Sequence, residues 1–203
     1  MALAGAAMLP AAAQQPIKIV TLGDSLVAGF NLSASDAFPA QLERALKAKG
    51  IAVEIANAGA SGDTASGGLA RLDWSVPSGT DAAIVTLGAN DMLRGVEPKV
   101  TREALTQIVS RLKARNIAVL LTGMLAAPNL GADYGRAFDA IYPEIAAAQG
   151  VLLYRFFLDG IAADAKLNQR DGIHPTAAGI AAIVVRMLPK VEELLAQVRN
   201  RRG

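Results

Sequence analysis

The chain has 203 residues, of which 52% are hydrophobic and 19% charged, so it can bury a sizeable core and lacks the composition of a disordered protein. Its net charge is +2, and the C-terminal segment 186–203, with five basic and two acidic residues, contributes +3 of this, so no nucleic-acid-binding face is indicated. The chain has no cysteine and one histidine, His174, which excludes disulfides, thiolate metal sites and sites with two or more histidine ligands.

The first residues resemble an export signal in part. Residues 1–15 carry no charged side chain, and Ala11, Ala12 and Ala13 have the small-residue pattern of a signal-peptidase site. The usual basic opening is missing, so a flexible apolar leader is the alternative, and the segment is too short to span a bilayer. We expect residues 1–16 to be a leader or signal-peptide remnant and residues 17–203 to form a single domain. The protein would be periplasmic or secreted if the leader is a signal, and cytoplasmic otherwise.

Beyond residue 16, short apolar runs alternate with amphipathic stretches. The runs are rich in leucine and β-branched residues and are typical of buried parallel strands. They cover residues 17–22, 51–56, 82–87, 117–122 and 151–156. Apolar residues at helical spacing predict helices starting at Phe38 and Val100, and a third from Ile180 to Val198 that Pro189 should kink or break. This alternation predicts an α/β fold, a three-layer α/β/α sandwich with right-handed crossovers.

Polar residues flanked by glycine follow four of the predicted strands. Such segments lie at the carboxyl ends of parallel strands, where active groups of open α/β sheets gather. They are residues 23–26, 57–63, 88–91 and 171–175. The recurrence of polar residues at the same edge predicts a functional site there.

Ser25, Asp171 and His174 are candidates for nucleophilic catalysis. A serine hydroxyl needs a base to remove its proton, and His174 is the single imidazole of the chain. Asp171 lies three residues earlier, so its carboxylate can reach back to the imidazole and fix its tautomer. Each residue also has an ordinary structural interpretation: a helix N-cap for Ser25, a turn for Asp171 and a structural histidine for His174.

A carbonyl attacked by Ser25 would become an oxyanion and would need donors aimed at it. The backbone N–H of Ser25 could supply one, the N–H of Gly59 another, since glycine allows close approach, and the side-chain amide of Asn90 a third. A turn or N-cap is the alternative role of Asn90.

These residues resemble the four sequence blocks of the GDSL, or SGNH, hydrolases. The blocks are Gly23-Asp24-Ser25-Leu26, Gly59, Gly88-Ala89-Asn90-Asp91 and Asp171-Gly172-Ile173-His174-Pro175. Within the family, the chain is similar to the bacterial arylesterase, acyl-CoA thioesterase I and lysophospholipase L1 branch. The resemblance implies a flavodoxin-like five-stranded parallel sheet with strand order 2-1-3-4-5. It also implies Ser25 as nucleophile, His174 as base and Asp171 as its orienter, with an oxyanion hole of Ser25, Gly59 and Asn90. The pair Phe30-Asn31 departs from the family's usual aromatic-glycine pair.

The expected function is therefore a serine hydrolase that cleaves carboxylic esters or thioesters with short to medium acyl chains, such as aryl esters, acyl thioesters or lysophospholipids. The partner would be a small-molecule substrate, without nucleic acid, stable membrane insertion, cofactor or metal. Substrate contacts are expected from Leu26 and from Leu125, Leu130 and Tyr134, which follow the fourth strand. A carbohydrate O-deacetylase of the same fold and a non-catalytic flavodoxin-like binding module are the alternatives. An aromatic content of 4% argues mildly against glycan stacking.

Overall fold

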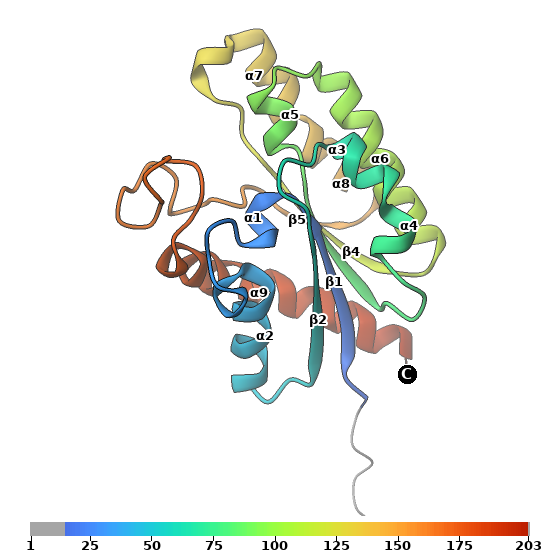
Figure 1. The fold of residues 1–203 in the computed structure, drawn as a ribbon. Helices are drawn as coiled ribbons and strands as arrows, with labels where there is room; N and C mark the ends of the chain where they lie inside the picture. The colour runs from blue at the N-terminus through green and yellow to red at the C-terminus, as the bar shows by residue number, and fades with distance from the viewer. Residues whose placement is uncertain (1–14, 203) are drawn as a thin grey trace, which may run out of the picture.

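A computed structural model describes residues 15–202, which contain a five-stranded parallel sheet. The strands follow the order β2-β1-β3-β4-β5, as the family resemblance implies (Figure 1). They are β1 (Ile17–Gly23), β2 (Val53–Gly59), β3 (Ala82–Thr86), β4 (Ala118–Thr122) and β5 (Leu152–Tyr154). The predicted three-layer α/β class is confirmed.

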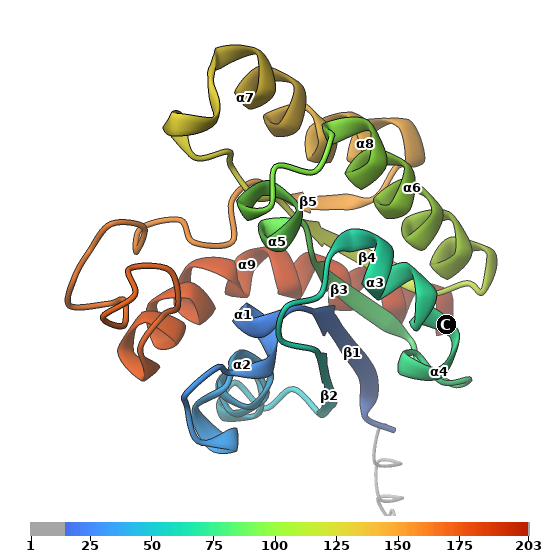
Figure 2. The same ribbon diagram turned by 45° about the horizontal axis from the view of Figure 1, so that its top comes forward.

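Helices cover both faces of the sheet (Figures 1 and 2). One face packs against α2 (Phe38–Ala48) and α9 (Ala177–Arg202), and the other against α3 (Ala65–Ala70), α6 (Pro98–Ala114) and α8 (Ile141–Gln149). Shorter helices lie in the connections. They are α1 (Ser25–Ala28), η1 (Ala34–Asp36), α4 (Leu72–Ser75), α5 (Ala89–Leu93), η2 (Pro128–Leu130) and α7 (Ala132–Asp139).

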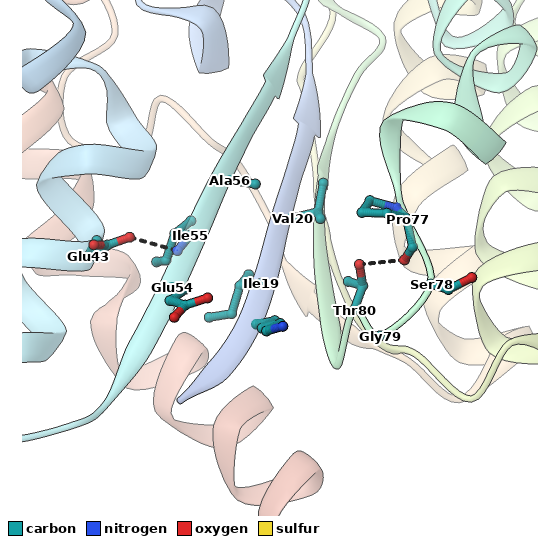
Figure 3. A pocket seen from close by; sticks show the side chains of 11 residues that line it. Ile19, Val20, Glu43, Glu54, Ile55, Ala56, Pro77, Ser78, Gly79 and Thr80 are labelled. Carbon is teal, nitrogen blue, oxygen red and sulfur yellow. Dashed lines mark hydrogen bonds between the residues drawn. The ribbon is translucent and has the colours of Figure 1, made fainter. Parts of the chain in front are cut away.

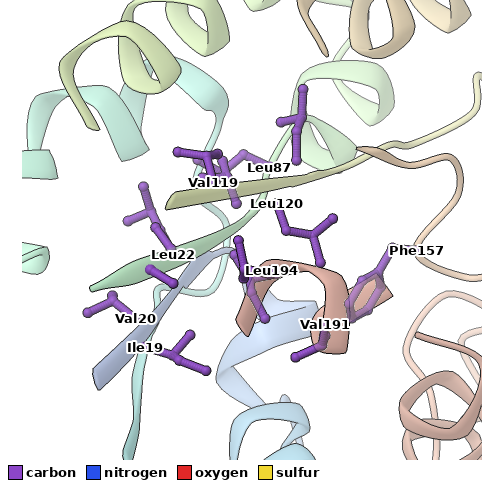
Figure 4. Packing of buried hydrophobic residues seen from close by; sticks show 14 of the residues in the cluster. Ile19, Val20, Leu22, Leu87, Val119, Leu120, Phe157, Val191 and Leu194 are labelled. Atoms are coloured by element: carbon purple, nitrogen blue, oxygen red, sulfur yellow. The ribbon is translucent and has the colours of Figure 1, made fainter. Parts of the chain in front are cut away.

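The core lies between the sheet and these helices. Every residue of β3 and β4 is buried, which explains their unbroken apolar sequences. On one side of the sheet, Leu120 lies near Phe157 and the α9 residues Val191 and Leu194 (Figure 4). The apolar stripes predicted for the helices at Phe38, Val100 and Ile180 fall within α2, α6 and α9, whose buried residues form this core.

The second strand lies further along the chain than its apolar run predicts. Residues 53–59, rather than 51–56, pair with β1, in the parallel register Ile17↔Val53 to Gly23↔Gly59. β2 is an edge strand with exposed positions, so a polar residue such as Asn57 can belong to it. β5 is shorter than predicted, at three half-buried residues.

Pro189 does not break the last helix. α9 runs continuously from Ala177 to Arg202. Proline removes the hydrogen bond to the carbonyl four residues earlier, at Val185. Pro189 and Val185 are both exposed, so solvent can satisfy that carbonyl on the outer face of the helix.

Candidate active site

Ser25 is placed at the carboxyl edge of the sheet by β1 and the short helix α1. β1 ends at Gly23, and the buried Asp24 caps α1 by accepting a hydrogen bond from the Leu26 N–H at 3.0 Å. Among the described residues, the Ser25 N–H has no hydrogen-bond acceptor. Ser25 therefore has both its hydroxyl and its backbone N–H available at the edge where the other loops converge.

His174 links Ser25 to Asp171, although Ser25 is 149 residues away in sequence. Its Nε2 lies 2.8 Å from the Ser25 Oγ, and its Nδ1 lies 2.7 Å from the Asp171 Oδ2. The Phe30 ring lies against the imidazole, with ring centroids 4.4 Å apart. The three residues predicted to form a nucleophilic site are thus brought into one hydrogen-bonded chain.

The charge on Asp171 sets the tautomer of the imidazole. Its Oδ1 accepts hydrogen bonds from the backbone N–H groups of His174 and Ile173, at 3.0 and 2.9 Å. These two bonds, with the one from the imidazole, lower the pKa of Asp171 from 3.8 to about 2. An ionised carboxylate only accepts, so Nδ1 carries the proton, and Nε2 of the neutral ring is left to accept from the Ser25 hydroxyl.

Asp24 is a second carboxylate close to the site, in a different environment. Its side chain is fully buried, and burial raises its pKa from 3.8 to about 6. The Leu26 N–H bond and the nearby His174 act in the opposite direction. Near neutral pH, a buried negative charge therefore lies beside the catalytic edge.

Asn90 enters the site from the start of α5. Gly88, with φ of 112°, caps this helix, and a Cβ there would lie 2.1 Å from the Tyr142 hydroxyl, so glycine is required. The Asn90 Nδ2 donates to the backbone oxygen of Asp63 at 2.9 Å and lies 3.4 Å from the Asp24 Oδ2. Asn90 thus bridges the segment before Ser25 and the loop that follows β2.

Gly59 is the residue predicted to supply a second backbone N–H to an oxyanion hole. Its N–H already donates to the Asn57 Oδ1 at 2.9 Å, and a Cβ at Gly59 would lie 2.3 Å from the Ala28 nitrogen. The structure therefore explains this glycine by the close packing of β2 against α1. The placement of its N–H in an oxyanion hole stays a prediction that the geometry does not favour.

Gly62 and Arg71 were not singled out from the sequence. The Gly62 N–H has no acceptor within the part of the chain that the structure describes, and its loop is next to Asn90 through Asp63. Arg71 secures that loop, because its Nε lies 2.5 Å from the Asp63 Oδ2 and its guanidinium donates to the Gly23 oxygen at 2.8 Å. Gly62 could have been found from the sequence as the second glycine of segment 57–63, whereas no local motif includes Arg71.

The four predicted substrate contacts differ in exposure. Leu26 is 3% exposed and packs in the core, where it lines a crevice beside Ser25 and His174 that is too narrow to hold a water molecule. Leu125 is 45% exposed, and Leu130 is half-buried. Tyr134 donates its hydroxyl to the Val96 oxygen at 2.9 Å, which ties α7 to the segment after α5. Leu125 and Leu130 therefore retain accessible apolar surface, whereas Leu26 does not.

A second depression lies at the opposite end of the sheet. It has a volume of about 390 Å³ and is formed by the first halves of β1 and β2 and by residues 77–80 (Figure 3). Its polar side chains include Lys18, Glu43 and Glu54, but neither Ser25 nor His174. The nucleophile and its base therefore lie away from this depression.

Comparison with known proteins places the chain among ester hydrolases. Residues 21–182 match the GDSL-like lipase/acylhydrolase family. The chain is 40% identical over 158 residues to the thioesterase 1/protease 1/lysophospholipase L1 of Escherichia coli K12, covering 77% of this chain and 74% of that protein. It is 35% identical over 178 residues to the esterase TesA of Pseudomonas aeruginosa, covering 87% and 89%. Among solved structures, AlinE4, an esterase of the SGNH-hydrolase family, has a TM-score of 0.76 and 42% identity, covering 91% of this chain and 99% of that one.

Proposed function

The chain belongs to the GDSL-like lipase/acylhydrolase family and is a carboxylic ester hydrolase of the SGNH type, and we propose that it works through an acyl intermediate on Ser25. The observation that carries this proposal is the hydrogen-bonded chain from the Ser25 Oγ through His174 to Asp171, at 2.8 and 2.7 Å. Nucleophile, base and orienting carboxylate are within hydrogen-bond reach of one another, as acyl transfer requires.

In the first half-reaction, the Ser25 Oγ forms a bond to the ester carbonyl carbon. His174 Nε2 takes the hydroxyl proton and then delivers it to the leaving oxygen or sulfur, whose bond to the carbonyl carbon breaks. In the second half-reaction, water replaces serine as the nucleophile and His174 again takes a proton, which returns to the Ser25 Oγ as the acid leaves. Asp171, ionised across the neutral range by its lowered pKa, stabilises the imidazolium in both halves.

We assign the oxyanion hole to the Ser25 N–H, the Asn90 amide and a backbone N–H of the loop after β2. The Ser25 and Gly62 N–H groups have no acceptors among residues 15–202. The Asn90 contact with Asp24 is long, at 3.4 Å, so the second amide hydrogen is only weakly bound and is available to a developing oxyanion while the bond to Asp63 persists. Gly62 takes the place predicted for Gly59, because the Gly59 N–H is bound to Asn57.

The substrate is proposed to be a small ester or thioester with a short to medium acyl chain. Apolar side chains are exposed on the loops at the catalytic edge: Phe30 and Ile173 beside the imidazole and Leu125 after β4 are 39%, 40% and 45% exposed. Such side chains favour an acyl chain over a glycan, which would present hydroxyl groups. The relatives' names include arylesterase and lysophospholipase, and these ester classes are the first to test here.

Export of the protein is proposed from the alanine pattern at residues 11–13, which lies outside the described residues. We propose that residues 17–203 act as one domain in the periplasm or outside the cell. In the described part of the chain, no helix combines the length and apolarity needed to cross a membrane. N-terminal sequencing of the protein recovered from its host tests the proposal: an N-terminus near residue 14 supports cleavage, and an intact Met1 contradicts it.

The catalytic assignment is tested with a fluorophosphonate, which reacts with activated serines. We expect one label per chain, on Ser25, together with turnover of aryl and acyl esters. Ser25→Ala should lose both label and turnover, whereas Ser78→Ala, a change at an exposed serine by the opposite depression, should keep both. Labelling at another residue, or full turnover by Ser25→Ala, would contradict the assignment. Absence of turnover with every ester would favour a binding module, and turnover of acetylated glycans alone would favour the deacetylase.

A further inference from the structure

We propose that Gln169 is a positioning residue that holds His174 in line with Ser25. It does so by joining the histidine loop, residues 169–175, to the Phe30 loop, residues 29–33. The proposal rests on the proposed function, because it concerns the base of that reaction. It adds a residue that the sequence motifs do not include.

The side chain of Gln169 bonds both loops. Its Nε2 donates to the backbone oxygen of Pro175, the residue after His174, at 2.9 Å. The same nitrogen donates to the backbone oxygen of Phe30 at 2.8 Å. Its Oε1 lies 3.4 Å from the Nδ2 of Asn31. One amide therefore uses both of its hydrogens to connect segments that are 139 residues apart in sequence.

The backbone of Gln169 acts on the same loop. Its N–H donates to the backbone oxygen of His174 at 2.7 Å, and its carbonyl oxygen accepts from the Gly172 N–H at 2.9 Å. These bonds close the turn that contains Asp171. The carbonyl groups of His174 and Pro175 are thus both held by Gln169, one by its backbone and one by its side chain.

The Phe30 loop matters because it contacts the imidazole on one side. The Phe30 ring lies 4.4 Å from the His174 ring, between centroids, and Ser25 is in the helix that leads into this loop. Fixing the Phe30 carbonyl relative to Pro175 therefore fixes the ring that limits rotation of the imidazole. Asn31, the next residue, has φ of 57°, a conformation that asparagine tolerates better than most residues.

This arrangement predicts a loss in catalysis larger than the loss in substrate binding. Without the amide, the imidazole keeps its bond to Asp171, but the two loops lose their direct side-chain link. A misplacement of about 1 Å in a catalytic group can lower turnover by about 100-fold. We expect Gln169→Met, which keeps side-chain length but has no donor, to lower kcat by about 10- to 100-fold and to change KM by less than threefold.

The test compares Gln169→Met and Gln169→Glu with the control Arg170→Ala, a change at the exposed neighbouring residue. His174 is the single histidine of the chain, so its Nδ1–H proton gives one unambiguous NMR resonance. In the wild type and the control this proton should be protected by Asp171 and appear at low field. In both Gln169 variants it should broaden through exchange, while urea midpoints stay close to the wild-type value. Gln169→Glu keeps the shape but loses the donors when ionised, so it should behave like Gln169→Met.

The outcomes separate this proposal from the proposed function. If wild-type Ser25 reacts with the fluorophosphonate and both variants keep wild-type kcat and the sharp proton resonance, Gln169 does not position His174. If KM and kcat change together and the urea midpoints fall, the role is structural and the proposal is wrong. If the wild type itself does not react at Ser25, the proposed function fails, whatever the variants do. Should Gln169→Met not fold, the resonance and kcat of Gln169→Glu decide the matter.

Discussion

Replacing Asp24 with asparagine is expected to stabilise the folded protein at pH 8 and to destabilise it slightly at pH 4. Asp24 is fully buried, and its pKa in the folded state is about 6 against an ordinary value of 3.8. The folded state therefore binds the proton more tightly than the unfolded chain does. The contribution of Asp24 to the free energy of unfolding is therefore highest below pH 4 and falls as the pH rises from about 4 to about 6.

The size of the effect follows from the difference of roughly two units between the pKa of Asp24 in the folded state and its ordinary value. Each unit corresponds to about 1.4 kcal/mol, so ionisation of Asp24 costs the folded state about 3 kcal/mol above pH 7. Asparagine removes that cost and keeps an oxygen to accept the Leu26 N–H. It also places an amide nitrogen near the Asn90 Nδ2, which then loses its weak bond to residue 24. The loss of this bond lowers the free energy of unfolding by about 1 kcal/mol. The net gain is about 2 kcal/mol at pH 8, and at pH 4 the variant loses about 1 kcal/mol.

Urea unfolding followed by far-UV circular dichroism measures this difference. The tryptophan fluorescence is a poor probe, because Trp74 is already 76% exposed in the folded state. Asp73→Asn, at an exposed aspartate on α4, is the matched control and should change the free energy of unfolding by no more than about 0.5 kcal/mol. A constant difference between Asp24→Asn and the wild type from pH 4 to pH 8 would refute the assignment of a raised pKa to Asp24.

The remaining predictions concern catalysis and packing. Asn90→Ala should lower kcat by about 10²–10³ with little change in KM, and an unchanged kcat would leave Asn90 with a structural role only. Asp171→Asn should lower kcat by about 10⁴ in steady-state assays, because the Nδ1 of His174 loses its acceptor. Since the pKa of Asp171 is about 2, this residue should add no step to the wild-type pH–rate profile above pH 4. Gly59→Ala should lower the free energy of unfolding by about 1–3 kcal/mol, because the new Cβ meets the Ala28 backbone at 2.3 Å; a urea midpoint like that of the wild type would contradict the packing role. Leu130→Ala should reduce kcat/KM increasingly as the acyl chain of the ester lengthens, and an equal loss for acetate would indicate a structural role.

The sequence by itself determined the fold class and most residues of the candidate site. Buried parallel strands need apolar residues on both faces, so β3 and β4 appear as unbroken apolar runs. Parallel strands also bring their carboxyl ends to one edge, so the polar residues that follow four of the five runs could be placed together from the sequence. The pairing of Asp171 with His174 is local, three residues apart, and was therefore readable from spacing alone.

The tertiary structure decided what depends on register and on hydrogen-bond direction. The Gly59 N–H belongs to an edge strand and donates to Asn57, whereas the Gly62 N–H, three residues later, has no acceptor among residues 15–202 and lies in the loop that Asn90 contacts through Asp63. Periodicity describes which face of a strand or helix is apolar, but it does not say where a backbone N–H points. For the same reason Gln169, whose bond to Phe30 spans 139 residues, has no local signature, because a contact between distant segments exists only once the sheet has brought their loops together.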